Sequence, residues 1–216
     1  GILGSGVVQL NIVIGTIIAS LLPLGAISHI YYADRLNQLP LAIFGIALGI
    51  VLLPSLSKSI KKNNIKEIDI IQKKSLEFSF LLSLPSAAGL YFLSEPIVYI
   101  LFERGAFLSA DTYYTSKVLS FFALGLPAYM FIKVLVVCFF AREDTKTPLY
   151  ISIVSVICNV ILSLILINSL REIGIALATA ISAWVNTTLL YFVLSHRGYL
   201  KFDYKLVIHF IKIMIS

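Results

Sequence analysis

Arg35 and its polar neighbours are the residues whose types and spacing could do chemistry. Tyr31, Asp34, Arg35 and Gln38 stand at positions i, i+3, i+4 and i+7, between two long apolar runs. In a helix this spacing places all four side chains on one face. Ionisable residues inside a membrane segment usually face a cavity and mark a substrate or ion path. We therefore predict an anion-binding stripe in which Arg35 is the cation.

Two interpretations of Arg35 follow from the residues. Asp34 and Arg35 are adjacent, so their side chains point about 100° apart and cannot pair face to face. On this interpretation the guanidinium keeps donors free for a ligand. Alternatively, Arg35 is a structural residue that snorkels to the membrane interface. The turn at Pro23 and Gly25 places it on the order of 10 Å into the helix, which suits both interpretations.

Two further polar residues lie inside apolar segments. Lys133 is a second cation, but a long side chain near a helix end can snorkel to the interface. Asn159 and Ser163 lie one helical turn apart, and they either line a polar path or form hydrogen bonds between helices. We predict Lys133 and Asn159 as possible cavity or coupling residues.

Motifs for catalysis, nucleotides and metals are missing from the sequence. It has no Gly-rich phosphate loop, no H-E-x-x-H or G-x-S-x-G motif and no converging carboxylate pair. His29, His196 and His209 have no partners at the spacing of metal ligands. We predict that the protein is not an enzyme and that it holds no metal and no cofactor.

The elements that position these residues are membrane helices. The chain is 59% hydrophobic and 13% charged, whereas soluble domains are about half apolar and a quarter charged. Several runs reach the roughly 20 apolar residues that cross a bilayer. The sequence predicts an all-α, polytopic transmembrane helical bundle with spans at 5–24, 28–56, 75–93, 113–140, 148–168, 173–194 and from 205 onward.

Local signals add detail to these spans. A short surface helix is predicted to begin at Ser94, within 94–110, and Thr147 is predicted to cap the span at 148–168. Prolines inside the spans tend to kink them; they are Pro40, Pro85 and Pro127. Small residues at four-residue spacing predict close helix packing; they are Gly45 with Gly49, and Gly174 with Ala178 and Ser182.

Basic residues gather in alternate loops. The loop at 57–74 carries six lysines, and the loops after 140 and after 196 are also basic. The positive-inside rule places these loops in the cytoplasm and Arg35 toward the outer side. The net charge of +6 is therefore a topology signal with some attraction to anionic membrane lipids, and we predict no nucleic-acid partner.

Several spaced motifs resemble those of the MviN/MurJ family. They are Tyr31-Tyr32-Ala33-Asp34-Arg35-Leu36, Leu52-Leu53-Pro54-Ser55-Leu56-Ser57, Leu101-Phe102-Glu103-Arg104-Gly105-Ala106-Phe107 and Phe140-Ala141-Arg142-Glu143-Asp144-Thr145-Lys146-Thr147-Pro148. This family comprises bacterial lipid II flippases of the larger multidrug/oligosaccharidyl-lipid/polysaccharide exporter (MOP) superfamily. The resemblance covers nearly the whole chain.

The resemblance implies a fold, a function and partners. Residues 1–196 would be the second, C-terminal six-helix lobe, and 197–216 a cytoplasmic linker and the start of the next helix. On this resemblance, the N-terminal lobe would be missing from this chain. The two lobes would enclose a cationic cavity, lined by Arg35, and flip lipid II from the cytoplasmic to the outer face of the bacterial inner membrane by alternating access. Expected partners are lipid II, membrane lipids and the missing N-terminal lobe.

One departure and two alternatives accompany this resemblance. Some family members carry carboxylates that could bind sodium at the positions that correspond to Gly15 and Ser163, so a cation site is not expected in this chain. A flippase for another polyprenyl-linked glycan or a drug exporter of the same superfamily is one alternative. A membrane scaffold or inactive fragment is the other.

Overall fold

A computed structural model of the protein describes residues 13–200, without the side chains of 46–49. The beginning of the span predicted at 5–24, most of the linker at 197–216, the span from 205 and His209 lie outside the described residues. Residues 13–19 are helical. The labelled helices are α2 (Ala26–Lys61), α3 (Ile65–Phe92), α4 (Ser94–Phe102), α5 (Ser109–Ala123), α6 (Leu126–Phe140) and α7 (Lys146–His196).

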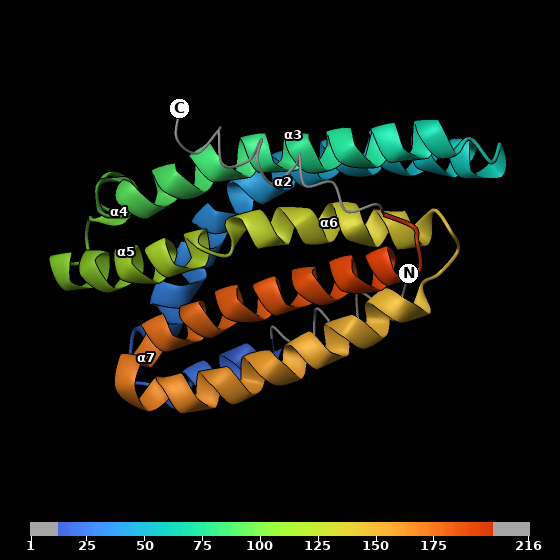
Figure 1. Ribbon diagram of the computed structural model, residues 1–216. Coiled ribbons are helices and arrows are strands. Elements are labelled where there is room, and N and C mark those ends of the chain that lie inside the picture. The colour runs from blue at the N-terminus through green and yellow to red at the C-terminus, as the bar shows by residue number, and fades with distance from the viewer. Residues whose placement is uncertain (1–12, 201–216) are drawn as a thin grey trace.

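The described chain is an all-α bundle, as predicted. Figure 1 shows long helices running side by side, with α6 between α3 and α7. By length and composition α7 can cross a membrane, and three bent helix pairs can each form one further span. Many large apolar side chains on the outside of the bundle are exposed, which suits a lipid environment.

The two spans predicted at 148–168 and 173–194 are the two arms of α7. The helix folds back at Arg171, whose backbone leaves the helical region with φ 53° and ψ −133°. Figure 1 shows the arms side by side and antiparallel. We call residues 146–170 the first arm and 172–196 the second arm.

The single span predicted at 113–140 is a bent pair of helices that together have the length and composition of one span. The segment forms two helices, α5 and α6, bent by 41° relative to each other, and α5 begins four residues early, at Ser109. Pro127 lies in the first turn of α6, where its missing N–H costs nothing. A Cβ on Gly125 would lie 3.0 Å from the Cα of Ala180. Glycine at the break therefore lets the second arm of α7 approach closely.

Helix ends differ from prediction in two places. The helix predicted at 75–93 begins ten residues earlier, at Ile65, where Asn64 accepts a hydrogen bond from the backbone N–H of Glu67. The first turns of α3 are rich in charged residues, so no apolar run marks where this helix begins. Thr147 is not the cap of α7. Its own N–H and hydroxyl donate to Asp144, at 3.0 and 2.6 Å, because Thr147 already lies inside the first turn, whose N–H groups need acceptors.

Other local predictions are confirmed. The short helix α4 begins at Ser94 and turns 71° away from α3. Pro40 and Pro85 lie inside α2 and α3, and the kinks predicted at them stay predictions. The main core lies where α6 meets α3, the end of α2 and the second arm, around Phe139, which is fully buried.

Candidate functional site

The four predicted stripe residues on α2 form one chain of contacts. The Arg35 guanidinium lies 4.7 Å from the centre of the Tyr31 ring and donates to the side-chain oxygen of Gln38 at 3.4 Å. The Gln38 amide in turn donates to Asp34. Asp34 therefore reaches Arg35 through Gln38 and not by direct pairing, in agreement with the expected geometry of adjacent residues.

Three of the four stripe side chains are exposed, and the fourth, Asp34, is half-buried. Tyr31, Arg35 and Gln38 are exposed, whereas Ala33 and Leu36, on the other side of α2, are buried. A guanidinium has five N–H donors. The hydrogen bond from Arg35 to Gln38 is long, at 3.4 Å, and uses one nitrogen of the guanidinium. The stripe thus presents a planar cation whose remaining donors are available to a ligand.

A first cavity of about 230 Å³ lies beside the stripe. Tyr31 and Asp34 line it from α2, Gly15 from the preceding helical segment and Thr179 from the second arm of α7. Of the two residues where the resemblance places sodium-binding carboxylates, Gly15 therefore lies close to Asp34. Asp34 is the carboxylate in this lining, and Gln38 binds it.

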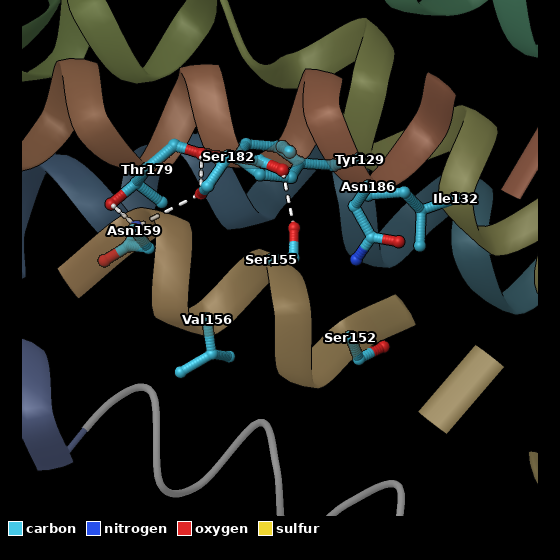
Figure 2. A pocket seen from close by; sticks show the side chains of 10 residues that line it. Tyr129, Ile132, Ser152, Ser155, Val156, Asn159, Thr179, Ser182 and Asn186 are labelled. Carbon is cyan, nitrogen blue, oxygen red and sulfur yellow. Dashed lines mark hydrogen bonds between the residues drawn. The ribbon is translucent and has the colours of Figure 1, made fainter. Parts of the chain in front are cut away.

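A second cavity of about 250 Å³ lies between α6 and the two arms of α7. Figure 2 shows its central hydrogen bonds: the Asn159 amide donates to the hydroxyls of Thr179 and Ser182, at 3.1 and 3.2 Å. Ser155 donates to the backbone carbonyl of Ser182 at 2.7 Å. The residues that line this cavity are uncharged, and Thr179 lines both cavities. Asn159 therefore links the two arms, the second of the two roles open to it.

Two polar atoms in the second cavity have no partner within the described chain. They are the Tyr129 hydroxyl and the side-chain oxygen of Asn186, both buried. A buried polar atom without a partner costs free energy, so water or a polar ligand is expected there. Ser163, the other position of the expected sodium site, donates to Asn159 at 3.5 Å. The oxygen atoms around Asn159 belong to neutral hydroxyl and amide groups, so this cavity lacks the carboxylate that the expected sodium site would use.

Lys133 lies apart from the stripe. Its exposed side chain crosses Gly45 so closely that a Cβ there would lie 2.9 Å from Nζ. Gly45 is ten residues beyond Arg35, about 15 Å along the helix axis. Gly45 in α2 thus makes room for the side chain of Lys133. The small residues of the second arm do pack closely, since Gly174 and Ala178 are buried.

Sequence reasoning missed a cluster around His29. The sequence shows no partner for His29 at the spacing of metal ligands, but in the fold its Nε2 lies 2.9 Å from Asp111 and its Nδ1 3.3 Å from Glu172. These partners are 82 and 143 residues away along the chain. No local spacing could have revealed them. Among the described residues, no group of three His, Cys, Asp or Glu side chains could hold a metal ion.

Comparison with known proteins settles the family. Residues 1–216 match the profile of the family described as lipid II flippase MurJ. The chain belongs to the MurJ family. A probable lipid II flippase MurJ from Rhizobium tropici is 45% identical over 211 residues, covering 98% of this chain and 39% of the relative. One from Rickettsia prowazekii is 47% identical over 189 residues, covering 88% and 37%. The chain thus spans about two fifths of these MurJ relatives.

Solved structures agree with this membership. A lipid II flippase MurJ in an inward closed conformation superposes with a TM-score of 0.81 at 31% identity, covering 97% of this chain and 45% of that one. A MOP superfamily transporter from Pyrococcus furiosus reaches 0.79 at 15% identity, which shows a shared fold. The predicted resemblance is confirmed. The protein is a multi-pass membrane protein of a flippase family, which is not a class of enzymes.

Proposed function

We propose that this chain is the C-terminal lobe of a bacterial lipid II flippase in the inner membrane. The MurJ family match over residues 1–216 and the coverage of 45% of a solved MurJ support this assignment. The lobe would comprise residues 1–196 and pair with an N-terminal lobe of similar size. The two lobes rock about the bound head group of lipid II while its polyprenyl tail stays in the membrane. This motion moves the head group from the cytoplasmic to the outer face.

Arg35 is the residue that binds the substrate in this proposal. Lipid II carries a pyrophosphate that cannot cross hydrocarbon unaided, and a guanidinium binds phosphate oxygens through two parallel hydrogen bonds. In a partly dry cavity this attraction is stronger than in bulk water. The observation that carries the proposal is the exposed guanidinium, stacked on Tyr31 and held by Gln38. Such support reduces the entropy that Arg35 loses on binding.

Asp34 and Gln38 act as positioning residues. Gln38 connects the Asp34 carboxylate to the guanidinium, so its amide orientation is fixed and its oxygen faces Arg35. Asp34 also lines the first cavity, next to Thr179. Tyr31 supplies the aromatic face. Asn159 and Lys133 stay predictions as cavity or coupling residues. In the structure Asn159 forms hydrogen bonds between the two arms of α7, and Lys133 lies against Gly45, apart from the stripe.

Complementation tests this proposal. Cells depleted of their own lipid II flippase receive the complete gene that encodes this chain, with Arg35 intact or changed to Ala or Lys. We expect Arg35→Ala to abolish rescue at normal membrane abundance, and Arg35→Lys to rescue in part because it keeps the charge and loses the bidentate geometry. Arg104→Ala is the matched control, because Arg104 is exposed and donates to the carbonyl of Leu101 in its own segment.

The outcomes separate the alternatives. Full rescue by Arg35→Ala would show that the residue snorkels to the interface and binds no substrate. Failure of the intact gene would point to another lipid-linked substrate or to a role without transport.

A further inference from the structure

His29, Asp111 and Glu172 meet at one end of the bundle. There α2 and α5 begin and α7 folds back between its arms, and Figure 1 shows the turn of α7 at the same end as the start of α5. His29 and Glu172 are 6% and 2% exposed, whereas the Asp111 side chain is 31% exposed. A buried imidazole thus lies between a buried and an accessible carboxylate, each from a different helix.

The charged and titratable groups around His29 come from two helices. From α5, Asp111 binds the ring, and Tyr114 stacks on it with ring centres 5.6 Å apart. From α7, Glu172 binds the ring, and Arg171 lies 3.7 Å from the second oxygen of Glu172. Arg171 also lies over the Tyr114 ring, at 5.7 Å. With a neutral imidazole and two ionised carboxylates, this group carries one net negative charge.

Hydrogen-bond chemistry makes this cluster dependent on a proton. A neutral imidazole has one N–H donor and one lone pair, and an ionised carboxylate only accepts. The contacts of His29 to Asp111 and Glu172 can therefore both be hydrogen bonds only when the cluster holds one additional proton, on the ring or on a carboxyl group. Without that proton, a ring lone pair faces a carboxylate lone pair, and one contact is lost.

We propose that His29, Asp111 and Glu172 form a proton-binding site that ties α2 to both α5 and α7. Protonation closes the tie, and release of the proton frees either the start of α5 or the turn of α7. Asp111 gives the proton a route to solvent. By the charge distribution of the loops this end faces outward, where a proton gradient acts. A role of this proton-binding site in driving flipping rests on the proposed function. The proton-dependent contact between α2, α5 and α7 does not.

Thermal unfolding at different pH tests the tie. The complete protein that carries this lobe is placed in lipid nanodiscs between about pH 5 and pH 8, the range in which an unperturbed histidine side chain changes its charge. Because the additional donor is present at low pH, we expect the wild-type midpoint to fall by about 2 °C as the pH rises, the loss expected for one charge-assisted hydrogen bond in a protein more than twice as long as this chain. His29→Gln should remove this dependence, since an amide does not titrate.

Two further variants make the test specific. Glu172→Gln should also flatten the pH dependence, because its amide donates to the neutral ring, and it carries the test if His29→Gln does not fold. His196→Gln is the control: it removes an exposed histidine at the far end of α7 and should keep the full dependence. An unchanged dependence in both His29→Gln and Glu172→Gln would overturn the proposal. The midpoint needs no lipid II, so failure of the proposed function would be seen separately, in the complementation assay.

Discussion

Gly174→Ala should destabilise the hairpin of α7. A Cβ at this buried position would lie 2.7 Å from the carbonyl oxygen of Leu166 and 2.9 Å from its carbonyl carbon. The oxygen would be about 0.7 Å closer than the 3.4 Å at which ordinary contact begins. Overpacking costs about 1–3 kcal/mol, toward the upper end here because backbone atoms cannot rotate away. Alanine recovers about 1 kcal/mol of helix propensity. The net loss is about 1–2 kcal/mol, or roughly 3–6 °C in the unfolding midpoint.

The fluorescence of Trp184 reports this loss, because it is the single tryptophan of the chain and lies on the second arm. Its indole N–H donates to the carbonyl of Leu124 at 3.0 Å, so separation of the arm changes its surroundings. Gly89→Ala in α3 is the matched control: a Cβ there meets no atom within 4 Å, and we expect it to be neutral or stabilising. A Gly174→Ala midpoint equal to that of Gly89→Ala would refute the close packing of the two arms.

Three other predictions follow from the described contacts. Asn159→Leu removes two interhelical hydrogen bonds, each contributing about 0.6 kcal/mol in membrane proteins, and should lower the unfolding midpoint by roughly 2–4 °C; no change would show that the network adds no stability. Burial opposes ionisation of Asp144, but hydrogen bonds from Thr147 and Arg197 outweigh it and hold its pKa below the ordinary 3.8. Its stabilising contribution is therefore present above the ordinary value and is lost as pH falls through the lowered one, so the midpoint should drop in acid, and Asp144→Asn should remove that part of the drop. Expression of residues 1–216 alone should not rescue cells that lack a lipid II flippase, because one lobe forms half of the proposed cavity; rescue would contradict the two-lobe proposal.

Local patterns made the stripe and most helices predictable. Tyr31, Asp34, Arg35 and Gln38 lie within eight residues, so the geometry of one helix decides their arrangement, whatever surrounds it. Apolar length predicted the membrane segments for the same reason. The break at Gly125 was missed because both halves of that span are apolar. Pro127 was recognised as a kink, but α5 ends at Ala123 and α6 begins at Leu126, where Gly125 lets Ala180 of the second arm approach.

Contacts between distant segments could not be predicted. Asn159 was a candidate, but its partners Thr179 and Ser182 depend on the register in which the arms of α7 pack. His29 and Glu172 are 143 residues apart and meet only after three helices have packed. In both cases the residue types carried a hint, a polar group inside an apolar run, but a single sequence does not say which polar groups face each other.

The distribution of contacts explains how this lobe could bind an anion without unpacking. At one end of the bundle His29 joins α2 to α5 and α7. At the other, Arg197 binds Asp144 at 2.5 Å and joins the end of α7 to its start. These contacts fix helices to each other. The contacts of Arg35 to Tyr31 and Gln38 come from its own helix, so exchanging them for phosphate oxygens breaks no contact between helices. A cation held in this way suits a lobe that moves as a rigid body around its substrate.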